Sequence, residues 1–133
     1  MRACQVNITT TADGKESRFS CKGTLEAENR SIRLRYADEN GETELLSDGV
    51  TVTIARQGAY SMRLVLRKGD MCVGKLGISG SEGVVQTQTN RIAYSVKESG
   101  VTMALHYALL FGLERQIMKI KIVAKYDKDG EKE

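Results

Sequence analysis

Several residue types that mark particular protein classes are absent or scarce in this chain of 133 residues. It has no proline, no tryptophan, one histidine and three cysteines. The odd cysteine count, without C-x-x-C spacing, favours reduced thiols over a disulfide framework. A single histidine excludes a zinc site built on paired histidines, and we expect no metal or cofactor. The lack of proline suits β-ladders, to which proline donates no N–H.

Long apolar runs and an excess of one charge are also missing. No segment approaches the ~20 apolar residues of a membrane span, and MRACQVNITT lacks a signal-peptide core. We therefore expect a cytoplasmic protein with no membrane partner. The 20 Lys and Arg are scattered among 17 Asp and Glu, giving a net charge of +3. This pattern is typical of a solvated surface, so we expect no nucleic-acid partner.

The residues that are present alternate between apolar and polar with a period of two, and no helical period persists. The stretch Val50–Ile78 predicts three antiparallel strands with one apolar face. Asp13-Gly14 predicts a two-residue hairpin turn, which places Ile8 opposite Phe19 and continues that register along both strands.

The other turns predict further hairpins. We expect Leu45 opposite Tyr36, and Arg56 opposite Tyr60 across a three-residue loop. Residues 77–83 (GISGSEG) predict a flexible connection. Between Thr89 and Ile92 the apolar phase shifts by one residue, which predicts a β-bulge near Asn90 or Arg91 or a corner between two strands.

About ten short strands joined by tight turns form a meander, and closing the meander removes its two exposed edges. We therefore predict an all-β fold, a single antiparallel up-and-down β-barrel of about 8–10 strands, spanning residues 1–126. The lumen of such a barrel is nearly filled by side chains and leaves room for one small ligand at most. Residues 127–133 are charged and predict a disordered tail.

Short motifs in this pattern resemble those of one known family. They are Arg56, Gly58, Met62-Arg63-Leu64, Gly69, Gly74, Thr87-x-Thr89 and Tyr107-x-Leu109. A chain with these motifs resembles the YwiB-like bacterial proteins, a family of unknown function. The resemblance implies a calycin-like (lipocalin-like) β-barrel in a bacterial cytoplasmic protein, and it implies no reaction. This chain departs from the family pattern at residues 76–83, which lack the proline of the family's turn.

Arg56 is the most informative candidate for a functional role, because its phase places a cation on the inner face. One interpretation is that its guanidinium leaves the barrel mouth while its stem covers apolar surface. The other is an inward guanidinium that binds the carboxylate or phosphate of a ligand. The first is favoured because an unpaired buried charge is costly.

Tyrosines share the inner face with Arg56. Convergent hydroxyls in an apolar lumen are typical of a small-molecule site, although in a filled core they would hydrogen-bond to one another or to the backbone. The candidate ligand-binding residues are Arg56, Tyr60, Tyr36, Tyr94 and Tyr107.

Two functional hypotheses follow. The first is a non-enzymatic protein that binds one small amphipathic or acidic ligand in the lumen. The alternative is a protein–protein interaction module, possibly a homodimer, with a solidly packed barrel and no ligand. The weakly patterned strand Thr43–Ser47 and a row of outward cations motivate this alternative. No acid–base pair or activated nucleophile is visible, so we expect no catalytic residues and no enzyme. The outward cations are Lys22, Arg33, Arg35, Arg63 and Arg67.

Overall fold

The computed structural model describes residues 1–28 and 30–127, which form ten strands and no helix. Consequently none of these residues belongs to a helix that could cross a membrane. The predicted tail falls almost entirely on residues 128–133, outside the described residues. The strands are β1 (Arg2–Ala12), β2 (Lys15–Glu28), β3 (Ser31–Asp38), β4 (Gly41–Ser47), β5 (Thr51–Gly58), β6 (Tyr60–Arg67), β7 (Met71–Ile78), β8 (Ser81–Lys97), β9 (Gly100–Phe111) and β10 (Glu114–Tyr126).

The ten strands form a closed antiparallel barrel in which every strand pairs with its sequence neighbours. The first and last strands close it, with a ladder from Cys4–Tyr126 to Ala12–Met118. This confirms the predicted fold class. Tight turns account for this order of the strands, because each turn brings a strand back beside the strand that precedes it in the sequence.

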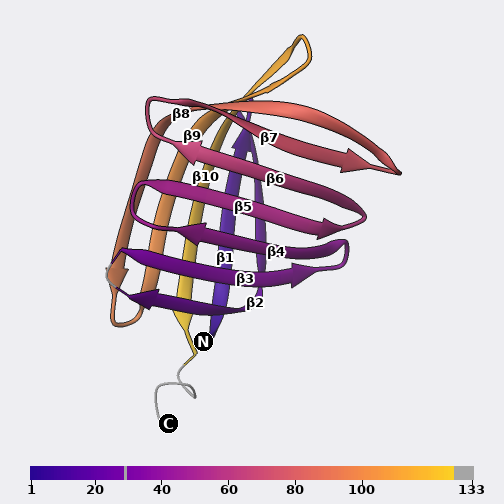
Figure 1. Ribbon diagram of the computed structural model, residues 1–133. Coiled ribbons are helices and arrows are strands. Elements are labelled where there is room, and N and C mark those ends of the chain that lie inside the picture. The colour runs from indigo at the N-terminus through magenta and orange to yellow at the C-terminus, as the bar shows by residue number, and fades with distance from the viewer. Residues whose placement is uncertain (29, 128–133) are drawn as a thin grey trace.

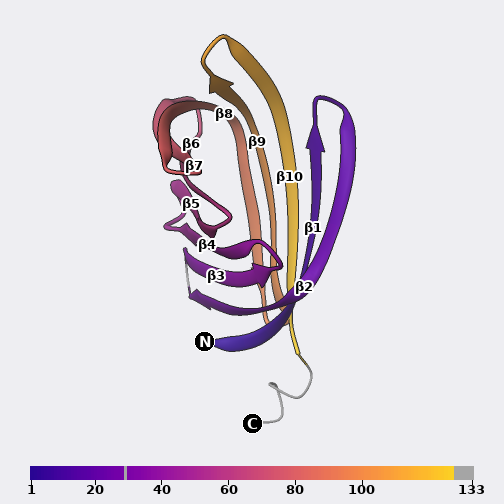
Figure 2. The same cartoon turned by 90° about the vertical axis from the view of Figure 1, so that its right-hand side faces the viewer.

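Two sheets make up the barrel wall and cross each other steeply (Figure 1). Strands β3–β7 run across one side, whereas β1, β9 and β10 run along the other; Figure 2 shows the two sheets from the side. Strands β2 and β8 belong to both sheets and turn the corners.

Each corner strand has a local feature that permits its bend. Strand β2 begins to pair with β3 at Gly23, where a Cβ atom would collide with the carbonyl oxygen of Arg35. In β8 the register shifts between Thr89 and Arg91. The predicted β-bulge is therefore confirmed, and it lies where the strand passes from one sheet to the other.

The core consists of the inward residues of both sheets. At one end of the barrel these side chains leave a residual space of only about 10 Å³, and we call this the packed end. Eight inward apolar side chains fill it: Leu25, Ile32, Leu34, Leu45, Val101, Met103, Ile122 and Ala124.

Some registers differ from those predicted. The first hairpin pairs Ile8 with Phe19, as predicted. Tyr36, however, pairs with Thr43 and not with Leu45. The reason is that the turn residues are Glu39 and Asn40, so that Asp38 pairs with Gly41, whereas the predicted register required Asn40 and Gly41 to form the turn.

Strands β5 and β6 also meet in a different register, because Arg56 pairs with Met62 and not with Tyr60. The reason is that β5 stays paired with β4 up to Gly58, whose φ is +156° and whose partner is Gly41. A Cβ on Gly58 would meet the Cα of Gly41 at 2.5 Å. Only glycines allow this approach, and the chain reverses beyond it.

The prediction of a flexible connection at residues 77–83 was wrong. Gly77 and Ile78 end β7, and Ser81 already begins β8. Only Ser79 and Gly80 form the turn, with φ of +49° and +82°. Positive φ at both central residues is the geometry of a two-residue hairpin turn.

Candidate functional site

Arg56 lies at the end of β5 with a side chain that is only 10% exposed. Its Nη2 donates to both carboxylate oxygens of Asp38, at 2.8 and 2.9 Å, and its Nη1 donates to the Thr43 hydroxyl at 2.9 Å. Asp38 ends β3 and Thr43 belongs to β4, so Arg56 ties three consecutive strands together.

Asp38 is held in its ionised form by this arrangement. The hydrogen bond from Arg56, followed by that from the Asn40 amide at 2.8 Å, lowers the pKa of its carboxyl group. In turn, the hydrogen bond to Asp38 raises the pKa of Arg56, although burial opposes the shift. The pair is therefore an ion pair at neutral pH.

The guanidinium of Arg56 has little capacity left for a ligand. Its Nε is buried without a hydrogen-bond partner among the described residues. One of its faces lies over the ring of Tyr60, 5.0 Å from the ring centroid. An external anion on the Nη2 side would have to displace Asp38, whereas Nε and the second N–H of Nη1 donate to no acceptor among the described residues.

The predicted tyrosines do not all converge on Arg56. Tyr36 lies nearby, since Thr43 hydrogen-bonds to it, and burial raises its pKa. Burial raises the pKa of Tyr107 to about 12, with Tyr36 as the next cause. Tyr60 is 37% exposed at the barrel mouth. Tyr94 lies elsewhere, because its hydroxyl is next to Gly49 at the β4–β5 connection.

A cavity of about 510 Å³ opens at the barrel end opposite the packed end. Its apolar lining comes from β6 to β9, that is, from both sheets. Met62, the register partner of Arg56, is part of this lining, but Arg56 and the four tyrosines are not. The apolar lining residues are Met62, Leu64, Leu76, Val85, Leu109 and Phe111.

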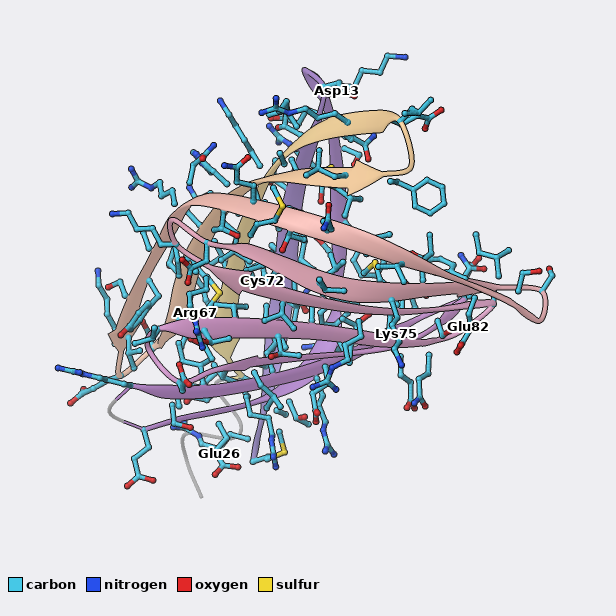
Figure 3. All side chains as sticks on the ribbon, turned by 45° about the horizontal axis from the view of Figure 1, so that its top comes forward. Asp13, Glu26, Arg67, Cys72, Lys75 and Glu82 are labelled. Carbon is cyan, nitrogen blue, oxygen red and sulfur yellow. The ribbon has the colours of Figure 1, made fainter. Side chains whose placement is uncertain are left out.

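Polar side chains border the mouth of this cavity and form what we call the rim: Asp13, Glu114, Arg115 and Gln116. Figure 3 shows Asp13 at the turn of the β1–β2 hairpin, next to the projecting β9–β10 hairpin. One oxygen of Asp13 accepts from the Ile117 amide at 2.9 Å, which fastens the two hairpins together. Within the described residues, Arg115 has no carboxylate within 4 Å.

The cavity has the chemistry of an amphiphile site, because an apolar pocket with a few polar groups at its edge is typical of small-molecule binding. Its volume lies within the usual range of about 300–1,000 Å³ for such sites. Nothing in the sequence showed that these residues line a space, because that depends on how far β6–β7 stands from β9–β10.

The outward cations cited for the interaction hypothesis are partly neutralised. Arg33 and Arg35 both form ion pairs with Glu44 of the neighbouring strand. Strand β4 is paired on both sides, and its inward Thr43 and Ser47 are buried. Strand β4 therefore has no unpaired edge, whereas Arg63 and Arg67 have no carboxylate within 4 Å among the described residues.

The cysteines are free thiols. Burial raises the pKa of Cys4 to about 11, so the thiolate is scarce near neutral pH. We expect that iodoacetamide at about pH 8 leaves Cys4 unmodified in the native protein and modifies it after unfolding in guanidinium. Peptide mass spectrometry checks this, and native-state alkylation of Cys4 would contradict it.

In the described part of the chain, no cluster of three His, Cys, Asp or Glu is placed to hold a metal ion.

Comparisons with known proteins place the chain in a family. Residues 4–123 match the model of a domain of unknown function, DUF1934. The fold matches the crystal structure of the ywiB protein from Bacillus subtilis with a TM-score of 0.83 and 18% identity, over 96% of this chain and 93% of that chain. No curated protein matches. The YwiB-like resemblance is thus confirmed: the chain belongs to the DUF1934 family of β-barrel proteins of unknown function.

Proposed function

We propose that this chain is a non-enzymatic binding protein that holds the apolar part of one small amphipathic molecule in the open end of its barrel. The observation that carries the proposal is the cavity of about 510 Å³, whose apolar wall continues directly into the core. An alkyl or aromatic group in this cavity would remove apolar surface from water and make dispersion contacts with its walls.

The polar end of the ligand belongs at the rim. Arg115 and Gln116 border the mouth, and the carboxylates of Asp13 and Glu114 stand beside them. A ligand carboxylate can pair with Arg115 without first breaking an ion pair, whereas at Arg56 it must compete with Asp38. The carboxylate of an acidic ligand, which the sequence led us to expect at Arg56, would therefore pair more readily with Arg115.

Two adjacent valines provide a matched test of the cavity. Val85 faces the cavity and is buried, whereas Val84 faces outward and is 66% exposed. We expect Val85→Phe to fill part of the cavity and weaken binding of a fluorescent fatty acid by about tenfold, equal to about 1.4 kcal/mol. Val84→Phe should leave binding unchanged, since its ring points away from the lumen.

Titration of the fluorescent fatty acid, with displacement by unlabelled decanoate and decanol, checks this. Near-ultraviolet circular dichroism of each variant shows whether the barrel remains folded. The absence of saturable binding in the wild type, or equal losses in the two variants, would reject the cavity as the site. Weakening of decanoate but not of decanol by Arg115→Gln would support an acidic ligand at the rim.

A second candidate, a homodimer, is favoured by exposed apolar side chains on the outer wall of β7 and β8. Met71, Val73 and Val84 are each more than half exposed. Their strands pair Met71 with Gln88 and Lys75 with Val84, so the three side chains occupy one face. Sedimentation equilibrium of the wild type and Val73→Lys tests this candidate. The molar mass of a monomer for both the wild type and Val73→Lys would exclude the homodimer.

A further inference from the structure

The outer wall formed by β8, β9, β10, β1 and β2 carries cations from strands that lie side by side (Figures 1 and 2). The registers of these strands place outward residues of neighbouring strands opposite one another, so that they form rows across the wall. One row runs from Arg91 through His106 to Lys119 on three adjacent strands. Another contains Lys97 and Lys125, on either side of Gly100. Lys121 lies two residues along β10 from Lys119, on the same face.

These cations are opposed by few acids. Glu16 is the only acid in the same rows, and it pairs with Arg18 at 3.3 Å. Lys22 pairs with Asp127 at 3.2 Å. Among the described residues, the remaining cations have no carboxylate within 4 Å. We call this surface the basic wall; its cations are Arg18, Lys22, Arg91, Lys97, Lys119, Lys121 and Lys125.

Electrostatics around His106 agree with this placement. Burial lowers the pKa of His106, and the neighbouring charges of Lys119 and Arg91 lower it further. Lys119 and Arg91 therefore disfavour the protonated form of His106, and an anion bound over the row would offset the positive charge of these two cations. On the opposite wall Arg33 and Arg35 are paired with Glu44, whereas Arg63 and Lys75 are not paired with an acid among the described residues.

We propose that the basic wall binds the phosphate backbone of double-stranded nucleic acid without sequence preference. Charge complementarity carries the proposal, since a duplex presents about one negative charge per 1.7 Å of its axis. Hydroxyl and amide side chains stand between the cations, and such groups commonly hydrogen-bond to phosphate and sugar oxygens. They are Gln5, Asn7, Thr9, Thr11, Ser95 and Thr102.

The composition of the basic wall favours a duplex over the two other polyanionic partners. Binding to an anionic membrane would use exposed large apolar side chains among the cations. Phe111 and Leu113 are exposed at the end of the β9–β10 hairpin, and Ile117 lies two residues before Lys119, so these apolar side chains gather beyond one end of the basic wall and not between its cations. Single strands are usually held by stacking on aromatic rings. The rows of the basic wall contain no Phe, Tyr or Trp in the described strands, and His106 supplies their one imidazole ring.

The scattered charge in the sequence had suggested no nucleic-acid partner. That expectation changes because side chains alternate between the two faces of each strand, so that cations apart in the sequence can share the outer face. Lys119, Lys121 and Lys125 are separated by residues that face the core or are uncharged. The cations gather only when five strands bring their outward positions together.

Fluorescence anisotropy with a labelled duplex of mixed sequence tests the proposal. We expect weak binding, with a Kd of about 10⁻⁶–10⁻⁴ M, that falls steeply as salt rises. The variant Lys119→Glu/Lys121→Glu should bind at least tenfold more weakly and should lower the slope of log affinity against log salt by about 2. The control Arg63→Glu/Lys75→Glu changes the net charge equally on the opposite wall, where Figure 3 labels Lys75.

Retained binding by the control, together with loss in the Lys119/Lys121 variant, would support the proposal. Equal losses in both variants would show that net charge alone attracts the duplex and would overturn it. So would absence of binding at low salt, tighter binding to single strands, or binding to vesicles of anionic lipid but not to the duplex. Circular dichroism confirms that each variant is folded.

Discussion

Gly100→Ala is expected to destabilise the barrel more than any other single methyl group added at a turn. Gly100 begins β9 with φ of +147°, a conformation that alanine rarely adopts. A Cβ atom there would also collide with the backbone carbonyl of Ala124 on β10. Backbone strain of about 1–3 kcal/mol and overpacking of about 1–3 kcal/mol together predict a loss of about 4 kcal/mol.

Urea unfolding followed by circular dichroism measures this loss, and Gly80→Ala is the matched control. Gly80 also has a positive φ, of +82°, but a Cβ there would meet nothing within 4 Å. Its substitution should therefore lower the free energy of unfolding by about 1 kcal/mol, from backbone strain alone. Similar losses in the two variants would show that the contact with Ala124 is unimportant.

The second large effect concerns the ion pair of Arg56 and Asp38. Removing Asp38 should lower the free energy of unfolding more than removing Arg56. Asp38→Ala leaves a guanidinium that is 10% exposed without its counter-ion, and we expect a loss of about 3 kcal/mol. Arg56→Leu leaves a carboxylate that is 21% exposed and remains within reach of water. We expect that substitution to lower the free energy of unfolding by about 1–2 kcal/mol.

Low pH should abolish the contribution of the Arg56–Asp38 ion pair to the free energy of unfolding. Because the pKa of Asp38 is lowered in the folded state, its ionised form stabilises the protein at pH values above the ordinary aspartate pKa of about 3.9. That stability is lost as the pH falls through the lowered pKa of the folded state. The difference in free energy of unfolding between wild type and Asp38→Asn should therefore be constant near neutrality and disappear in strong acid.

Urea titrations of wild type, both single variants and Asp38→Ala/Arg56→Leu complete a double-mutant cycle. A coupling energy near zero, or a difference that persists in strong acid, would show that the ion pair does not contribute to stability. Fatty-acid binding by Arg56→Leu separates the two roles considered for Arg56. Unchanged binding with lowered stability would identify it as a structural residue.

Much of the fold could be predicted because hairpin turns and alternation act over short distances. Asp13-Gly14 fixed the register that pairs Ile8 with Phe19, and the phase shift before Ile92 located the β-bulge. The β5–β6 register was not predictable in the same way. It depends on Gly41 and Gly58, which approach each other from different hairpins.

The candidate site was predictable only in part, for a similar reason. Alternation placed Arg56 on the inner face, but its partner Asp38 lies 18 residues earlier at the end of another strand. Nothing local in the sequence links the two residues. The cavity depends on the separation of two sheets, and the basic wall depends on five registers at once. These properties arise from tertiary structure.

Closure of the barrel has a consequence for the chain during its synthesis. Every other ladder joins strands that follow one another, so hairpins can form as soon as they leave the ribosome. The ladder between Cys4–Ala12 and Met118–Tyr126 cannot form until the last strand has emerged. Until then the nascent β1 presents an unpaired edge, the part of the molecule most open to mispairing with another chain. The strand β10 must therefore have emerged before this edge of β1 is protected from aggregation.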